Sequence, residues 1–148
     1  ILEEKKIYLG LGNLEMRKIA IDTNVYSAFK ENDSSIKKLF QRVEFIGIDI
    51  TVIAELYSGF KMGNRETQNR EELASFINSP RVEVLYHDLE TAEFYAFIGN
   101  SLRKKGKSIP TNDIWIAATS LRHGLALASS DRLFKEIDGL MLIHPGNP

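Results

Sequence analysis

KIAIDTNVYSAF, residues 18–29, joins a short apolar run to an abrupt change in polarity. The run at 19–21 has three consecutive apolar residues, which is typical of a strand buried on both faces of a sheet. It ends at Asp22, and Thr23 and Asn24 follow. A carboxylate at the end of a buried strand either caps a helix that begins next or faces a positive charge. The rest of the chain must distinguish these two roles.

Short apolar runs of this kind recur along the chain and alternate with longer segments of helical period. The predicted strands are residues 18–21, 44–48, 82–86, 125–128 and 140–143. Apolar residues three to four positions apart indicate helices around residues 36–40, 52–60, 73–77, 94–102 and 114–121. Strands that are apolar throughout and alternate with helices favour a parallel sheet covered on both faces. We therefore predict an α/β fold, a three-layer α/β/α sandwich around a central, mainly parallel five-stranded sheet.

Length and composition are those of one ordinary domain. The chain has 148 residues, of which 43% are hydrophobic, and this is enough to bury a single core. We expect residues 16–148, from the internal Met16 onward, to form this domain. Residues 1–15 are expected to be an N-terminal extension.

Charge and cysteine content narrow the function classes. The formal net charge of -1 excludes a general basic surface, so a nucleic-acid partner would need a local basic patch or bound cations. The chain has no cysteine, which excludes disulfides and thiolate metal sites and fits a cytoplasmic location. No apolar run approaches the roughly 20 residues that cross a bilayer, so we expect no membrane association.

Four acidic residues are predicted to gather at one edge of the sheet. Ligands of parallel α/β sheets bind beyond the carboxyl ends of the strands. Asp22 follows the first strand and Asp131 follows the fourth. Glu55 lies in the helix that Thr51 can cap after the second strand, and Asp113 lies in the first turn of the helix before the fourth strand. Each acid alone also fits a structural role, as a helix cap or a solvent-facing side chain.

The cluster as a whole favours a cation. Four carboxylates in a partly dry cleft repel one another strongly unless positive charge neutralises them. Oxygen ligands favour Mg²⁺ or Mn²⁺ over zinc. Such ions activate water and hold a leaving oxygen in phosphodiester hydrolysis.

Three segments in order closely resemble the PIN-domain family, in particular the VapC-type toxins of prokaryotic toxin–antitoxin pairs. They are IAIDTNVYSAF, ITVIAELYSGF and IPTNDIWIAATSLRHGLALASSDRLFKEIDGLMLI, and the resemblance runs from about residue 18 to residue 143. It implies a metal-dependent endoribonuclease that cleaves RNA, forms a homodimer and is inhibited by a small antitoxin. The chain differs at Ser129 and Ser130, where such proteins usually carry Thr-Asn or a similar pair. A hydroxyl is kept at 129, so the difference bears on substrate positioning and not on metal binding.

The resemblance and the chemistry together assign roles to the acids. The expected acidic quartet is Asp22, Glu55, Asp113 and Asp131. Asp22 and Asp113 are expected to bind the metal directly, and Glu55 directly or through water. Asp131 either binds a second metal or orients the attacking water. Three polar neighbours could steer the carboxylates or touch the scissile phosphate, or could serve only as turn residues: Thr23, Asn24 and Ser129.

Two further surfaces are predicted to meet partners. A basic run at the end of one helix could contact RNA, or could simply be a solvated helix terminus: Arg103, Lys104, Lys105 and Lys107. An exposed apolar surface around Leu56, Tyr57 and Phe60 is expected to receive an amphipathic helix of the antitoxin.

Two other function classes stay open. One is a PIN-fold RNA-binding or scaffold module with negligible catalysis. The other is an acid-based phosphatase with Asp22 as covalent nucleophile. That enzyme would want a second Asp two residues later, where this chain has Asn24. We favour the ribonuclease.

Overall fold

The computed structural model describes residues 18–146. The expected N-terminal extension, residues 1–15, lies outside this range, as does the internal Met16. Within the described range no helix is both long enough and apolar enough to span a bilayer.

Five parallel strands form one central sheet, as predicted. They are β1 (Lys18–Ile21), β2 (Phe45–Asp49), β3 (Val82–Leu85), β4 (Ala126–Ala128) and β5 (Leu142–Ile143). The strand order is β3-β2-β1-β4-β5, and every neighbouring pair runs parallel. The predicted strands are all present, with ends that differ by no more than two residues. β1 is therefore central, with β2 on one side and β4 on the other.

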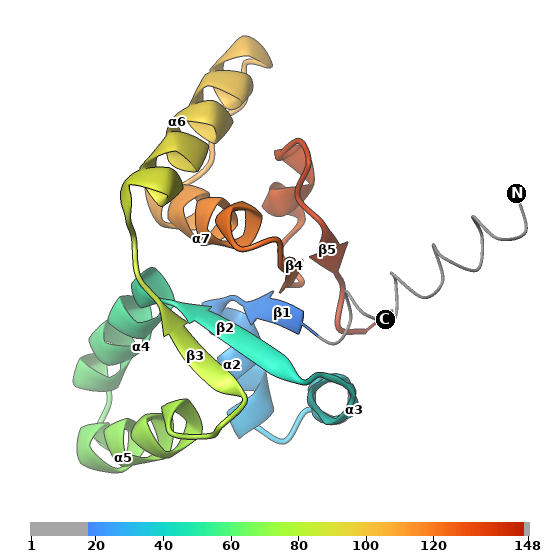
Figure 1. The fold of residues 1–148 in the computed structure, drawn as a ribbon. Coiled ribbons are helices and arrows are strands. Elements are labelled where there is room, and N and C mark those ends of the chain that lie inside the picture. Colours follow the sequence, from blue (N-terminus) through green and yellow to red (C-terminus); the bar gives the residue numbers. More distant parts are fainter. Residues whose placement is uncertain (1–17, 147–148) are drawn as a thin grey trace, which may run out of the picture.

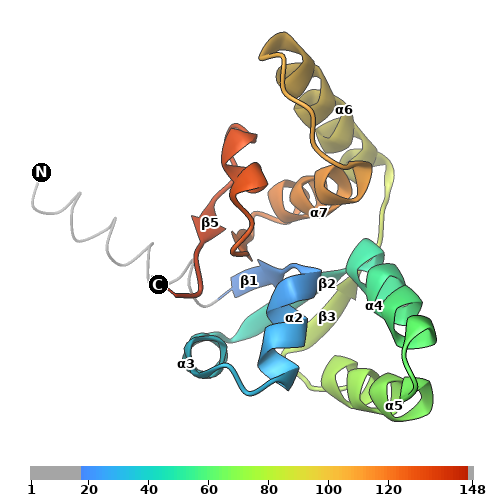
Figure 2. The same cartoon turned by 180° about the vertical axis from the view of Figure 1, so that it is seen from behind.

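Helices cover both faces of the sheet and complete the three-layer α/β/α sandwich (Figure 1). The helices are α2 (Thr23–Lys30), α3 (Ser34–Arg42), α4 (Ile50–Met62), α5 (Glu66–Ile77), α6 (Leu89–Lys104) and α7 (Thr111–Arg122), with a 3₁₀-helix η1 (Arg132–Glu136). The chain steps in one direction from β1 through β2 to β3, then returns across the sheet to β4. Right-handed crossovers therefore place α2 to α5 on one face and α6 and α7 on the other, as Figure 2 also shows from behind.

The strand order reverses between β1 and β4, and at such a point open α/β sheets bind ligands in a crevice beyond the carboxyl ends of the strands. We call this part of the structure the crevice. Buried aliphatic side chains hold these strands in place. Ile19, Ile21 and Leu127 are fully buried, and such side chains each stabilise the fold by about 1.5–3 kcal/mol. The crevice thus has rigid walls.

Two helix starts differ from the sequence interpretation. α2 was not among the predicted helices, yet it begins directly after Asp22, whose Oδ1 accepts the backbone N–H of Val25 at 2.9 Å. α4 is capped by Asp49 and not by Thr51, because the backbone N–H of Thr51 donates to Asp49 Oδ2 at 2.8 Å. Both strand-end aspartates therefore act as caps.

Candidate active site

Asp22 lies at the centre of the crevice and is 5% exposed. Its Oδ1 accepts the N–H of Val25, and its Oδ2 accepts the hydroxyl of Ser129. Burial raises the pKa of Asp22, and the charges of Asp131 and Glu55 raise it further, against the lowering effect of the two hydrogen bonds. The carboxylate is therefore both a cap and a member of an acidic group.

Glu55 enters the same crevice from the second turn of α4. It is half-buried, and its Oε1 accepts the hydroxyl of Thr23 at 2.7 Å. Thr23 is the first residue of α2. This bond joins α2 to α4 and holds Glu55 towards the end of β1.

Asp113 lies in the first turn of α7, on the opposite side of the crevice. It is half-buried, and burial raises its pKa to about 6, with further contributions from the charges of Asp131, Glu55 and Asp22. The three other predicted acids therefore lie near enough to Asp113 for their charges to influence its carboxyl group.

Asp131 completes the group from the loop after β4. Its Oδ1 accepts the N–H of Leu133 at 2.9 Å and caps η1. Its own backbone N–H donates to Ser129 Oγ at 3.0 Å. Ser129, which is 4% exposed, thus connects Asp22 with Asp131. The hydroxyl kept at this position fixes two of the acids.

Within the described part of the chain, no Lys, Arg or His side chain forms an ion pair with the quartet. In the same part of the chain, no three His, Cys, Asp or Glu side chains stand close enough together to hold a metal ion as they are. The oxygen-only donor set fits a hard cation, and binding one would draw the carboxylates inward.

Other residues predicted for the site lie farther from the acids. Asn24 is exposed and lines a separate hollow with Ala28 and His144. The basic run lies at the end of α6, which in Figure 1 leans away from the sheet. There Lys105 Nζ donates to the Glu136 carbonyl at 2.9 Å. The structure does not bring this run to the quartet.

A second buried acid, absent from the sequence interpretation, lies one strand away. Asp49 is 2% exposed, and its Oδ1 accepts Thr119 Oγ1 at 2.5 Å and pairs with His87 Nε2 at 2.8 Å. The signal for it was in the sequence: IGID at 46–49 repeats the pattern of IAID at 19–22.

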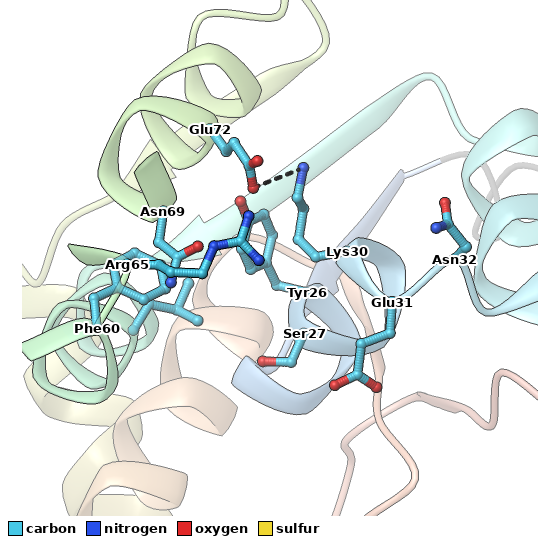
Figure 3. Close-up of a pocket in the computed structure, with 10 residues that line it drawn as sticks. Tyr26, Ser27, Lys30, Glu31, Asn32, Phe60, Arg65, Asn69 and Glu72 are labelled. Atoms are coloured by element: carbon cyan, nitrogen blue, oxygen red, sulfur yellow. Dashed lines mark ion pairs between the residues drawn. The ribbon is translucent and has the colours of Figure 1, made fainter. Parts of the chain in front are cut away.

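A hollow of about 560 Å³ opens between α2, α4 and α5 (Figure 3). Lys30 Nζ and Glu72 Oε2 pair across it at 3.3 Å, and Arg65 reaches into it from the turn before α5. Tyr26 is buried in its wall, and its hydroxyl makes no hydrogen bond within the part of the chain that the structure describes. Burial, followed by the charge of Glu72, raises the pKa of Tyr26 to about 12. Phe60 lines the hollow as well.

This hollow corrects the predicted apolar surface around Leu56, Tyr57 and Phe60. Leu56 is only 4% exposed, because it packs into the core. Tyr57 is half-buried, and the Arg70 guanidinium lies 3.9 Å from its ring centroid. The region is therefore a polar hollow with an apolar base.

Known proteins resemble this chain in sequence and in fold. The model of the PIN domain matches residues 19–140. VapC ribonuclease Y4jK of Sinorhizobium fredii is 32% identical over 139 residues, covering 88% of this chain and 99% of that protein. The structure of VapBC2 from Rickettsia felis, bound to a DNA fragment from their promoter, has a TM-score of 0.77 at 25% identity and covers 84% of this chain and 96% of that one. DNA-bound VapBC from Salmonella typhimurium has a TM-score of 0.77 at 26% identity, covering 85% and 96%. The chain belongs to the PIN-domain family.

Proposed function

We propose that the protein is a metal-dependent endoribonuclease that hydrolyses RNA phosphodiester bonds. The observation that carries this proposal is the quartet in the crevice. Burial and the charges of the other acids raise the pKa of Asp22 and of Asp113, and none of the four carboxylates has a basic partner in an ion pair among the described residues. A bound cation would favour the ionised form of these carboxyl groups and offset their mutual repulsion. The names of the similar VapC ribonucleases support RNA as the substrate.

Each acid has a role that follows from its position. Asp22 and Asp113, which interact through their charges, would bind Mg²⁺ or Mn²⁺ directly, and Glu55 would bind directly or through water. Asp131 would hold a second ion or orient the attacking water. A bound ion of this kind supplies charge stabilisation at the phosphate and a more acidic water.

The neighbouring hydroxyls keep the acids in place. Ser129 donates to Asp22 and accepts from the backbone of Asp131, so it fixes both at the end of β4. Thr23 fixes Glu55. Side chains that are held before the substrate arrives need less reorganisation during the reaction.

A cleavage assay with a parallel binding measurement tests the metal. The protein is incubated with mixed RNAs in chelator, and then with millimolar Mg²⁺ or Mn²⁺. We expect cleavage only with the ion, together with a rise in the thermal midpoint that Asp113→Asn largely removes. An equal rise in Asp113→Asn, or equal cleavage in chelator, would contradict a metal site at the quartet.

The competing proposal is a PIN-fold RNA-binding or scaffold module with negligible catalysis. The observation in its favour is that, among the described residues, no three acids are already grouped around a metal position. If RNA binds and stays intact with Mg²⁺ and with Mn²⁺, this proposal replaces the ribonuclease.

We also propose a small antitoxin as partner, since the similar solved structures are VapBC complexes. An amphipathic helix would lie over the hollow between α2, α4 and α5, with a basic side chain directed to the acids. Phe60→Glu should weaken the complex about 100-fold or more, as for a central contact residue. Leu133→Glu, on the 41% exposed Leu133 of η1, is the matched control. Equal affinity of both variants would place the partner elsewhere.

A homodimer is the remaining proposal for assembly. Sedimentation at increasing protein concentration measures it directly. A sedimenting species of one chain at all concentrations would contradict it. Cytoplasmic location stays a prediction.

A further inference from the structure

A second hollow, of about 730 Å³, adjoins the quartet on the side of α4. Its walls are α4, which contributes Thr51, Glu55 and Met62, and the start of α7, which contributes Asn112 and Trp115. We call it the α4–α7 groove. Its volume lies in the range of about 300–1,000 Å³ typical of small-molecule sites. Because Glu55 lines the groove and also belongs to the quartet, the two are continuous.

His87, from the loop after β3, lines the same groove. Its Nε2 pairs with the buried Asp49 at 2.8 Å and lies 3.3 Å from Thr51 Oγ1. Its ring stacks on Trp115 with centroids 4.3 Å apart and planes at 11°, and Tyr95 packs on Trp115 at 4.2 Å. The imidazole is therefore held rigidly by both a carboxylate and an aromatic ring.

This arrangement determines what His87 presents to the groove. Nε2 is the nitrogen that faces the Asp49 carboxylate, so in the neutral ring it carries the proton. Nδ1 makes no hydrogen bond to the residues that the structure describes. It is then a fixed acceptor for an N–H group of a ligand.

We propose that the α4–α7 groove binds the nucleobase next to the scissile phosphate and thereby sets the sequence preference of cleavage. This inference rests on the proposed ribonuclease function. His87 Nδ1 would accept from an exocyclic amino group, which adenine, cytosine and guanine carry and uracil lacks. Asn112 would bond another edge of the base, and Thr51 lies within reach of the same site.

The lining of the groove favours a base over a charged ligand. Aromatic and aliphatic surfaces, including Trp115 and the 87% exposed Met62, alternate with hydroxyl and amide groups. Glu55 is its one acidic or basic side chain apart from His87. The hollow beside Tyr26, by contrast, carries Lys30 and Arg65 together with acids. Single-stranded RNA is read by such surfaces, with apolar contact to the base and hydrogen bonds at its edge.

The groove contains its own probe, because Trp115 is the only tryptophan of the chain. Its fluorescence is followed while AMP, CMP, GMP or UMP is added to the full chain in chelator. We expect a saturable change, with the amino-bearing bases binding about fivefold more tightly than UMP, the scale of one hydrogen bond. His87→Ala should remove this preference. His123→Ala, at the exposed end of α7, is the control and should keep it.

A second groove variant tests whether the effect of His87→Ala comes from misfolding. Asn112 is exposed in the first turn of α7, so Asn112→Ala should fold normally and still weaken nucleotide binding. With random-sequence RNA and metal, both groove variants should change which nucleotide flanks the cut, while the control should not. Unchanged flanking nucleotides in both would overturn the inference.

The two measurements separate this inference from the ribonuclease proposal. If the wild type cleaves no RNA but nucleotides bind at Trp115 with the expected preference, the ribonuclease fails and the base site stands. If RNA is cleaved but no nucleotide changes the fluorescence, the base site fails and the ribonuclease stands. A fluorescence change that depends on protein concentration and not on nucleotide would mean that a second copy covers the groove, and would also overturn the inference.

Discussion

Two aspartates occupy matching places in the sheet and differ in almost everything around them. Asp22 ends β1 in the pattern IAID, and Asp49 ends β2 in the pattern IGID. Both are at least 95% buried, and both cap the helix that follows, through Val25 N–H at 2.9 Å and Thr51 N–H at 2.8 Å. Position in the fold therefore does not separate them.

The other groups around the two carboxylates do separate Asp22 from Asp49. Asp49 also receives hydrogen bonds from Thr119 and pairs with His87, so donors surround it. Asp22 receives one bond from Ser129, and its other close groups include the acids Asp131 and Glu55. A buried acid surrounded by donors stabilises the fold, whereas a buried acid among acids is held ready for a ligand.

The largest expected difference is in RNA cleavage. Asp22→Asn is nearly isosteric and removes only the anionic ligand, so cleavage should fall about 100- to 1,000-fold, the scale of losing one group that stabilises transition-state charge. Asp49→Asn should change the rate less than about tenfold, because it lies behind His87 and not in the quartet. Cleavage of a labelled RNA with Mg²⁺ or Mn²⁺ measures both. Equal losses would remove the distinction between the two sites.

The free energy of unfolding should show the opposite order, with the larger loss on replacing Asp49. Asp49→Ala leaves Thr119 and His87 without their acceptor, so the free energy of unfolding should fall by about 2–3 kcal/mol. Asp22→Ala loses a cap, but it also relieves repulsion among the acids, so its loss in chelator should be much smaller. Denaturant unfolding of both variants tests this order. A larger loss for Asp22→Ala would make Asp22 chiefly structural.

Ser129 and Thr119 donate hydroxyl hydrogen bonds to Asp22 and Asp49, and replacing them should have smaller effects than replacing the acids. Ser129→Ala removes the hydrogen bonds that hold Asp22 and Asp131 in place, so RNA cleavage should fall about tenfold. The free energy of unfolding should change little. Thr119→Val should lower the free energy of unfolding by about 1 kcal/mol and leave cleavage nearly unchanged. Kinetics and unfolding are measured on both proteins. The reverse pattern would exchange the roles of the two acids.

The smallest effect concerns pH. The pKa of Asp113 is raised from 3.8 to about 6, so in chelator the folded state holds a proton that the unfolded chain has released. The contribution of Asp113 to stability is fully present below about pH 4 and is lost as pH rises through about 6. The free energy of unfolding of the wild type, minus that of Asp113→Asn, should therefore decrease over this window.

Asp88→Asn is the matched control for pH. Hydrogen bonds from the Thr91 backbone and hydroxyl lower the pKa of Asp88 to about 2. The contribution of Asp88 to stability is fully present above pH 3.8, the ordinary pKa of Asp, and is lost only as the pH falls towards 2. The free energy of unfolding of the wild type, minus that of Asp88→Asn, should therefore stay constant between pH 4 and pH 7. A flat curve for Asp113→Asn as well would mean that its carboxyl group titrates normally.

The sheet and its layers were predictable because burial on both faces leaves continuous apolar runs at the central strands β1 and β4. α2 was not predicted, although Val25, Ala28 and Phe29 follow helical spacing, because a helix of 8 residues leaves only about two turns of repeat. The strand-end rule located Asp22 and Asp131, and the first turn of α7 located Asp113.

Long-range contacts were beyond the reach of local patterns. Asp49 meets His87 across 38 residues and Thr119 across 70. Leu56 was taken for a surface residue because the helix period of α4 does not reveal which of its faces α2 and α5 cover. Packing against distant segments determines both outcomes, and no short window of sequence contains it.

The bond between Ser129 and Asp22 joins residues 107 positions apart. A growing chain on the ribosome presents Asp22 and Glu55 well before Ser129 and Asp131 have been synthesised. Parallel pairing between such distant strands also forms slowly. We therefore expect the crevice to assemble only after the segment that carries Ser129 has left the ribosome, so the order of translation itself postpones the assembly of the quartet.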